Sequence, residues 1–307
     1  MKTDLFYWLL NAGIFGSVIG LGVLALRRIR RLPRRAVYVL WALPLLRLWL
    51  PFGLSSKFSL LTLISRYATK TVTVYQSVSL PDITMSNAVQ AADSYFPVTY
   101  KTNMLEQVFT VAALVWLVGF CALVITGIFL YAFTSAEIRK ARHLRDNVYV
   151  SASVTAPALY GIIRPRIVIP MYMETETANL DYVLLHENAH ARRKDNLFRC
   201  AALLTAALHW YNPLVWLFLK RYMEDVELAC DESVAAQLSP HERKAYALAL
   251  VDAAEQRSAF VSAFGGAKIR VRVGKILSYR SLSVGAAAAL AVLLIVVAVT
   301  LLTNATV

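Results

Sequence analysis

Residues 186–190 read His186-Glu187-Asn188-Ala189-His190, the pattern His-Glu-x-x-His, and lie between apolar segments long enough to cross a membrane. On a helix, residues four apart project from one face, so the two imidazoles can bind a single Zn²⁺. The carboxylate of Glu187 lies beside them, where it can take a proton from a metal-bound water. The pattern therefore predicts a helix that carries a zinc site, with His186 and His190 as ligands and Glu187 as the catalytic base.

The composition places this helix in a membrane protein. Hydrophobic residues make up 58% of the 307 residues and charged residues 17%, and the mean hydropathy is +0.54. The formal net charge of +13 could indicate nucleic-acid binding, but six of the nine residues 27–35 are Arg and directly follow an apolar run. Such a cluster is a topology signal that faces the cytosol and anionic lipid. We therefore expect contact with membrane lipid and no direct contact with nucleic acid.

Four apolar runs are predicted to span the membrane: Leu5–Leu26, Ala36–Phe52, Met104–Phe133 and Val284–Leu302. The second run is the weakest prediction, because it contains Pro44 and Arg47. Basic residues cluster after the first run, after the third and before the fourth, which is one side of the membrane if the chain crosses four times. This arrangement predicts a multi-pass protein of the bacterial cell membrane with its N-terminus outside and the His-Glu-x-x-His helix in the cytosol.

The predicted organisation follows from these spans. It comprises residues 1–52 (the first two spans and their Arg-rich loop), 53–103 (an extracellular loop), 104–133 (the third span), 134–282 (a cytosolic domain), 283–303 (the fourth span) and 304–307 (an outside tail). The further apolar run Cys200–Leu219 is interrupted by residues 209–213, where Asn-Pro favours a turn. A crossing there would separate the two histidines from the acidic segment that follows. We therefore expect two shorter helices, buried in the cytosolic domain or dipping into the membrane interface.

Short β-like runs begin the cytosolic segment: Val148–Ser153, Tyr160–Ile163 and Arg166–Pro170. They predict a small twisted sheet whose edge strand can pair with an extended substrate through backbone hydrogen bonds. Residues 71–75 of the outer loop also alternate with the period of a strand. The expected fold class is thus a polytopic α-helical membrane protein with four spans and a cytosolic α+β, gluzincin-like zinc metallopeptidase domain.

A zinc peptidase site needs a third protein ligand, which leaves one position for water. A metzincin arrangement is excluded, because it would need His at Asn196 and Gly at Arg193. The run RYMEDVELACDES (221–233) is acidic and helix-like, and Glu227 and Asp231 share one face of it. One can bind zinc while the other accepts the free N–H of a ligating histidine. Glu224, three residues before Glu227, is the competing ligand, and a solvated helix face is the plainer alternative for Glu227.

Other polar and thiol-bearing residues are expected to have structural roles. Cys121, Cys200 and Cys230 offer neither a disulfide framework nor a Cys-x-x-Cys site, so buried thiols are expected. His209 is expected to pack or to bond backbone, and Asp195 to end a helix or pair with a neighbouring Arg. A residue that stabilises the oxyanion is also required, and Tyr246 and His241 are the candidates on the following helix.

Three stretches carry a family resemblance: HENAHARRKDN (186–196), HWYNPLVW (209–216) and ELACDES (227–233). With the Arg-rich loop and the four spans, they make the chain similar to the M56 peptidases, the membrane metallopeptidase half of the β-lactam sensor-transducers BlaR and MecR. The resemblance implies that His186, His190 and Glu227 bind Zn²⁺, that Glu187 is the general base and that Asp231 supports a ligating histidine. It also implies a cytosolic winged-helix repressor of the BlaI/MecI type as substrate, cut in response to an extracellular signal.

One feature of those sensor-transducers has no match here. Their extracellular penicillin-binding domain follows the fourth span, whereas five residues follow Leu302 in this sequence. We therefore expect sensing through another protein or through residues 53–103, or else that the chain is a fragment without its sensor. The small-residue segment Ser258–Gly266 is a candidate for self-cleavage, a linker being the simpler interpretation, and a homodimer is compatible with the sequence. The alternative functions are a membrane-protein quality-control protease and a non-proteolytic receptor or scaffold with a vestigial zinc site.

Overall fold

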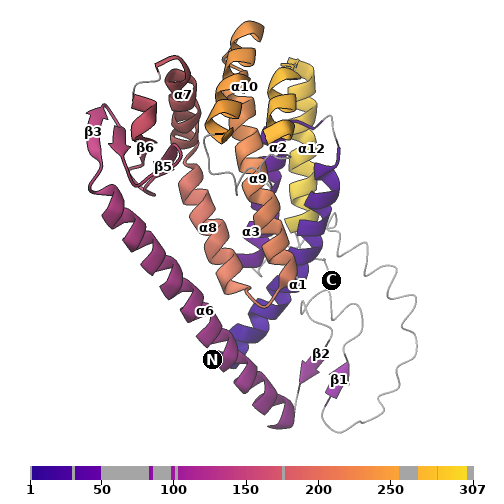
Figure 1. Ribbon diagram of the computed structural model, residues 1–307. Coiled ribbons are helices and arrows are strands. Elements are labelled where there is room, and N and C mark those ends of the chain that lie inside the picture. The colour runs from indigo at the N-terminus through magenta and orange to yellow at the C-terminus, as the bar shows by residue number, and fades with distance from the viewer. Residues whose placement is uncertain are drawn as a thin grey trace.

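Helices α1 (Lys2–Arg27) and α6 (Asn103–Ile138) are the longest helices among the described residues of this computed structural model (Figure 1). The structure describes residues 2–29, 32–49, 83–85, 98–100, 103–174, 177–255, 269–281 and 283–302. Within the described residues, Leu5–Arg27 and Val108–Ile138 are long and apolar enough to cross a membrane, and Val284–Thr300 is a shorter apolar helix. The helices predicted for the first and third runs are confirmed, although α6 continues five residues beyond its predicted end.

The second predicted span is not one helix. It forms α2 (Arg34–Leu40) and α3 (Ala42–Trp49), which are separated at Trp41. The fourth predicted span forms α12 (Val284–Leu302). Large apolar side chains of α6 and α12 are exposed, among them Phe129 at 68% and Ile295 at 63%. An apolar helix with this much exposed surface is suited to contact with lipid.

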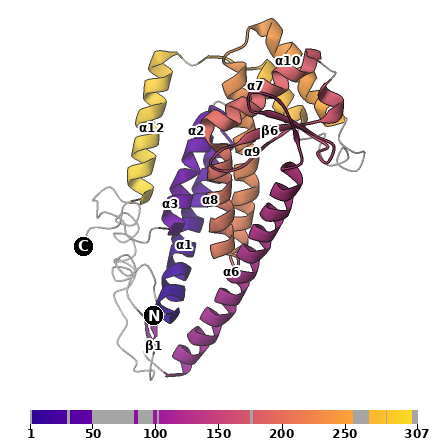
Figure 2. The same ribbon diagram turned by 90° about the vertical axis from the view of Figure 1, so that its left-hand side faces the viewer.

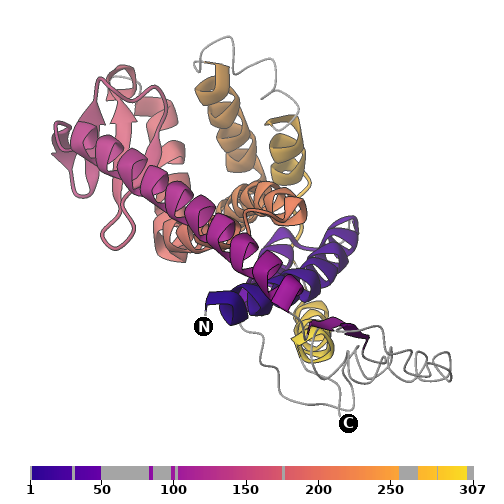
Figure 3. The same ribbon diagram turned by 90° about the horizontal axis from the view of Figure 1, so that it is seen from below.

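A four-stranded sheet lies at one end of α6, and Figure 3 shows α6 running from beneath this sheet toward α1. Its strands are β3 (Arg142–Arg145), β4 (Val148–Ser151), β5 (Ala158–Tyr160) and β6 (Arg166–Pro170), in the order β3-β4-β6-β5. Strands β4 and β6 are parallel, and the other pairs are antiparallel. The predicted sheet is therefore present, and β5 is its edge strand on the side of helix α7 (Thr177–Arg193).

Strand β5 ends earlier than the sequence predicted. Gly161 takes a φ of +97°, and a Cβ at that position would lie 3.0 Å from the carbonyl oxygen of Arg164. Only glycine adopts this conformation without strain, so the chain turns there rather than continuing to Ile163. Between α3 and α6, β1 (Ile83–Met85) pairs with β2 (Val98–Tyr100). The predicted strand over residues 71–75 and the candidate cleavage segment 258–266 lie outside the described residues.

The run Cys200–Leu219 forms a helical hairpin. Helix α8 (Asp195–Leu208) and helix α9 (Pro213–Ala235) meet at residues 209–212, where the Asn212 side chain caps α9 by accepting from the Leu214 amide at 3.0 Å. The chain therefore turns back, as expected, and α9 returns to pack against α7 (Figure 1).

The tip of this hairpin lies deeper along the apolar helices than the sequence indicated. The Tyr211 hydroxyl donates to the Leu9 carbonyl at 3.1 Å, and Asn212 Nδ2 donates to Ser17 Oγ at 2.8 Å. Trp116 Nε1 of α6 donates to the Leu208 carbonyl at 2.8 Å. At a rise of 1.5 Å per residue, Leu9 is about 27 Å from Arg27 at the other end of α1. The hairpin thus accompanies α1 over most of its length and meets α6 around Trp116.

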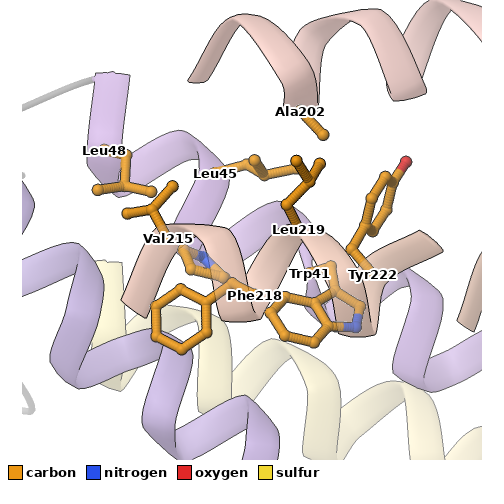
Figure 4. A pocket seen from close by; sticks show the side chains of 9 residues that line it. Trp41, Leu45, Leu48, Ala202, Val215, Phe218, Leu219 and Tyr222 are labelled. Carbon is orange, nitrogen blue, oxygen red and sulfur yellow. The ribbon is translucent and has the colours of Figure 1, made fainter. Parts of the chain in front are cut away.

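The helices around the hairpin pack through an aromatic core. Trp41, Phe218 and Tyr222 are each less than 5% exposed, and Figure 4 shows them gathered between α3, α8 and α9. The void that remains there measures about 20 Å³ and is lined mostly by apolar side chains. A void of this size and polarity stays dry and costs little packing energy, so α9 is held firmly against its neighbours.

A buried ion cluster fixes the polar end of α9 to α1 and α2. Asp225 is fully buried, and its two carboxylate oxygens accept from Arg27 Nε at 3.0 and 2.8 Å. Trp41 Nε1 donates to the same carboxylate at 2.9 Å, and Arg34 lies 3.6 Å away. Some of the arginines interpreted as a topology signal therefore also bind α9.

We expect Asp225→Ala to lower the free energy of unfolding by about 3–5 kcal/mol, because it leaves buried arginine charge without its partner. Chemical denaturation of the purified protein in mild detergent measures the change. Asp181→Ala is the matched control, since Asp181 is 83% exposed and lies 3.7 Å from Arg145. Comparable destabilisation by both variants would show that the Asp225 cluster does not hold α9 in place.

Candidate metal site

The predicted site residues converge at the end of the molecule that holds the sheet. His186 and His190 lie on α7 and are 6% and 3% exposed. Glu227 and Asp231 lie on α9, and Glu187 is 9% exposed beside the histidines. Helix α10 (Pro240–Glu255) and a helix over residues 269–277 close the far side of α7 and α9. Their packing passes through one buried cluster that includes Ala189, Cys230, Tyr246 and Ile276.

Two imidazole nitrogens and one carboxylate face a common point. His186 Nε2 and His190 Nε2 are 3.1 Å apart, and each lies 3.6 Å from an oxygen of Glu227. Zinc–nitrogen and zinc–oxygen bonds of about 2.0–2.1 Å in a tetrahedral site require ligand atoms roughly 3.3 Å apart. The two 3.6 Å distances run to different oxygens, Oε2 for His186 and Oε1 for His190, so the carboxylate lies close enough to share one metal ion with both rings.

Hydrogen bonds on the other ring nitrogens orient both histidines. His190 Nδ1 donates to Asp195 Oδ2 at 2.6 Å. His186 Nδ1 donates to the Tyr246 hydroxyl at 2.8 Å, and that hydroxyl donates to Asp231 Oδ1 at 2.8 Å. In the neutral, metal-binding form of each ring these bonds place the proton on Nδ1, which leaves both Nε2 atoms free to bind a cation.

Asp231 lies behind His186 as expected, but Tyr246 stands between them in the hydrogen-bond chain. The direct separation of His186 Nδ1 from Asp231 Oδ1 is 3.4 Å, longer than either bond through Tyr246. Tyr246 is fully buried, and burial together with the Asp231 carboxylate raises the pKa of its hydroxyl. Tyr246 therefore does not fit the oxyanion role considered for it, and His241 is exposed and makes no described contact with the site.

Asp195 begins α8 and lies 3.4 Å from Arg193 Nε, in line with the expected structural role, but its bond to His190 was not expected. It is fully buried and also accepts from the Tyr38 hydroxyl at 3.2 Å. In a continuous helix, residue i+5 lies well round from residue i and could not reach its ring. Lys194 takes a left-handed conformation (φ 56°, ψ 36°), which ends α7 and turns Asp195 back toward His190.

We expect Asp195→Ala to weaken zinc binding about 10–100-fold, the usual effect of removing a carboxylate that supports a ligating histidine. A chelator competition titration of the purified protein measures the affinity. Asp181→Ala removes an exposed carboxylate from α7 and should leave the affinity unchanged. An unchanged affinity in the Asp195 variant would show that its bond to His190 does not support the metal.

His186 and Arg272 lower the pKa of the Glu227 carboxylate. Arg199 Nη2 lies 2.5 Å from Oε1, and Arg272 Nη1 lies 3.6 Å from Oε2. Burial would raise the pKa of Glu227, but His186, Arg272 and His190 hold it well below its usual range. The competing residue Glu224 is bonded to Arg27 at 2.9 Å and to Arg221 at 3.0 Å, away from the histidines. The geometry therefore favours Glu227 over Glu224.

Cys230 is a second candidate for the third ligand. It is fully buried, as expected, and its Sγ donates to the His186 carbonyl oxygen at 3.5 Å. The ligand atoms of His186, His190 and Cys230 all lie within 4.8 Å of one another. Cys230 is three residues after Glu227, so the same face of α9 presents both to α7. The two candidates differ in exposure, because the Glu227 carboxylate is 33% exposed whereas Cys230 is fully buried.

Arg272 belongs to the site although the sequence indicated only a topology signal. Its Nε and Nη2 donate to the two oxygens of Asp231 at 2.7 and 2.8 Å. The same Nη2 lies 3.4 Å from His186 Nε2. Nothing in its sequence context distinguishes Arg272 from its basic neighbours, because the contact depends on how the helix over residues 269–277 packs against α9.

The edge strand β5 lies near Glu187. Burial and the Glu187 carboxylate both raise the pKa of the Tyr160 hydroxyl, so this strand residue lies toward Glu187. Asn196 of α8 donates to the Leu159 and Gly161 carbonyl oxygens at 2.8 and 3.0 Å. The end of the predicted substrate-binding edge is thus fixed to the helix that carries Asp195.

Comparison with known proteins assigns the chain to a family. A family model described as BlaR1 peptidase M56 matches residues 7–272. The chain belongs to the M56 peptidase family. The regulatory protein BlaR1 of Bacillus licheniformis is 36% identical over 89 residues, 29% of this chain and 15% of that protein. The methicillin resistance mecR1 protein of Staphylococcus aureus is 28% identical over 99 residues, 31% of this chain and 17% of that protein. The family match covers both α7 and α9, and hence all the residues of the metal site up to Arg272.

Zinc binding at this M56 site should depend on pH. Burial lowers the pKa of His190, but its bond to Asp195 raises it to about 9. A ligating imidazole must be neutral, so below pH 9 zinc has to displace a proton. We expect the apparent affinity to fall at least about tenfold for each pH unit below 9, which chelator competition at pH 6.5, 7.5 and 8.5 measures. A constant affinity over this range would contradict a protonated His190 in the metal-free protein.

Proposed function

We propose that this M56 peptidase is a zinc-dependent metalloendopeptidase, embedded in the membrane, that cleaves a cytosolic protein. The carrying observation is the convergence of His186 Nε2, His190 Nε2 and the Glu227 carboxylate on one point, with Glu187 beside it. The orientation of both rings through Asp195 and Tyr246 supports a built metal site rather than a chance cluster of histidines.

Metal binding, proton transfer and orientation of the histidine rings are assigned to different residues. His186, His190 and Glu227 would hold the ion, which when bound acts as a Lewis acid toward water and the scissile carbonyl. Glu187 takes a proton from the attacking water and gives it to the departing amine, so that hydrolysis is balanced without another acid. Asp195, and Tyr246 with Asp231 behind it, keep the two rings in the ligating tautomer. Arg272 neutralises Asp231 and Glu227 and faces the same point.

Topology decides which proteins can reach the site. We propose four crossings, formed by α1, by α2 with α3, by α6 and by α12, with the Arg-rich end of α1 in the cytosol. The site lies at that end, because α9 carries both Glu227 and the Asp225 that binds Arg27. The α8–α9 hairpin enters the membrane from the cytosolic side and returns. The substrate is then a cytosolic protein.

The substrate that best fits the family is a transcriptional repressor of the winged-helix type, cut after a signal arrives from outside the cell. The names of the two relatives, a regulatory protein and a methicillin resistance protein, support a regulatory role. Cleavage of the chain itself within residues 258–266 is a second hypothesis, to be checked by mass spectrometry of purified active protein.

A proteome comparison tests the proposal. The proteomes of cells with the wild-type chain and of cells that carry Glu187→Gln are compared. In parallel, cleavage by the purified enzyme is measured with and without a metal chelator. One cytosolic repressor accumulating in the variant supports regulated proteolysis. Accumulation of many membrane proteins would replace it with quality control, and no change, together with no cleavage by the purified protein, would reject peptidase activity in favour of a receptor or scaffold.

A further inference from the structure

A cavity of about 800 Å³ lies between α2, α9, the helix over residues 269–277 and α12. Figure 2 shows α12 standing beside α2 and α3 and joined to the rest of the molecule at its upper end. None of the candidate metal ligands lines the cavity. A volume of this size is within the range of cavities that bind small molecules.

One wall of the cavity is basic. Arg34, Arg35, Lys275 and Arg280 line it, together with the carboxylate of Glu232. That carboxylate already accepts from the backbone amides of Arg34 and Arg35 at 2.6 and 3.2 Å. The Arg35 guanidinium donates to a backbone carbonyl at 2.8 Å, and Arg280 makes no ion pair with any residue that the structure describes. Arg34 instead lies 3.6 Å from the buried Asp225 carboxylate. Arg35, Lys275 and Arg280 therefore give the wall an excess of positive charge over Glu232, which an anion would compensate.

The opposite wall is apolar. Ala287, Leu290 and Leu294 of α12 line it, and Val39 of α2 is a further apolar lining residue. These residues follow α12 from its start toward the middle of an apolar helix, which is the direction of the membrane if α12 crosses it. A free phosphate would leave this wall without a partner, whereas an acyl chain would cover it.

We propose that this cavity binds an anionic phospholipid, with the phosphate against Arg35, Lys275 and Arg280 and an acyl chain along α12. Basic pockets between membrane helices on the cytosolic side recognise such headgroups. The inference rests on α12 lying in the membrane and is independent of proteolysis, so either can fail alone. The cavity shares α9 with Glu227 and the helix over residues 269–277 with Arg272, so the lipid would contact two elements of the metal site.

Native mass spectrometry of the full chain in detergent tests the proposal. Phosphatidylglycerol and phosphatidylcholine with the same acyl chains are titrated separately, and the bound lipid is counted. Lys275→Gln with Arg280→Gln should weaken phosphatidylglycerol binding about 10–30-fold, as expected for two basic residues near a lipid headgroup. Arg139→Gln with Arg270→Gln is the matched control, because both arginines are exposed on the same side and neither lines the cavity.

Equal weakening of phosphatidylglycerol binding in the two double variants would overturn the proposal, as would equal binding of the two lipids by the wild type. Displacement of the lipid by inorganic phosphate at a similar concentration would overturn it too. The last would indicate a site for free anions. Should the charge variant fail to fold, Ala291→Trp fills the apolar wall and keeps every charge. Unchanged phosphatidylglycerol binding in that variant would equally reject an acyl chain along α12.

Discussion

Replacing Glu187 by Gln is expected to slow peptide-bond cleavage by about 10²–10⁴-fold and to leave the zinc content unchanged. Gln has the shape of Glu, but it cannot accept the proton of the attacking water. The ring nitrogens that face the metal position have Glu227, Arg272 and each other as neighbours, so the loss of the Glu187 charge leaves the ligand set intact. Cleavage of the repressor identified by the proteome comparison, followed by gel with purified protein, measures the rate, and elemental analysis measures zinc.

The matched control is Glu174→Gln, which makes the same chemical change at the carboxylate that pairs with Arg142 beside the sheet. It should cleave at the wild-type rate. A Glu187→Gln enzyme that retains cleavage within a few-fold of the wild type would remove Glu187 as the base. Loss of zinc along with activity would instead mean that Glu187 contributes to metal binding, which the contacts around His186 and His190 do not indicate.

The sequence predicted those parts of the site that depend on local periodicity. His186 and His190 are four residues apart on α7 and so share a face of that helix, with Glu187 next to His186 in the sequence. Glu227 and Asp231 share a face of α9 for the same reason. The long helices followed from the length and apolarity of their runs. The interruption at Asn212-Pro213 correctly indicated a turn, because proline cannot continue the preceding helix and Asn212 caps the next one.

The parts that could not be predicted depend on tertiary contacts. Asp195 reaches His190 because Lys194 adopts a left-handed conformation, which its residue type disfavours. Tyr246 and Arg272 come from elements more than forty residues beyond α7, and only the packing of those elements brings them to the site. The depth of the α8–α9 hairpin is likewise set by its partners on α1 and α6. The second predicted span breaks at Trp41, whose indole N–H donates to Asp225. The hydrophobicity of the run alone could not predict this contact.

Replacing Glu227 by Ala is expected to lower zinc affinity by well over a hundredfold. Loss of a residue that only hydrogen-bonds a ligating histidine costs at most roughly a hundredfold. The variant loses a negatively charged ligand, and it also leaves Arg199 and Arg272 unneutralised beside the metal position. A divalent cation would then be repelled by two guanidinium groups in a partly buried site, where charges are weakly screened. Chelator competition measures the affinity, and Glu224→Ala on the same helix should leave it unchanged because Glu224 binds Arg27 and Arg221 instead.

Cys230→Ala decides between the two candidate ligand sets. If Glu227 is the third ligand, the Cys230 variant keeps wild-type zinc affinity, and the cobalt-substituted wild-type protein lacks a thiolate-to-metal charge-transfer band. Loss of zinc in the Cys230 variant together with retention in the Glu227 variant would assign the site to two histidines and a cysteine. In that case the Glu227 carboxylate, partly exposed and held between two arginines, would be left to contact the substrate. The choice matters for mechanism, because a carboxylate ligand leaves the ion a stronger Lewis acid toward water than an electron-rich thiolate does.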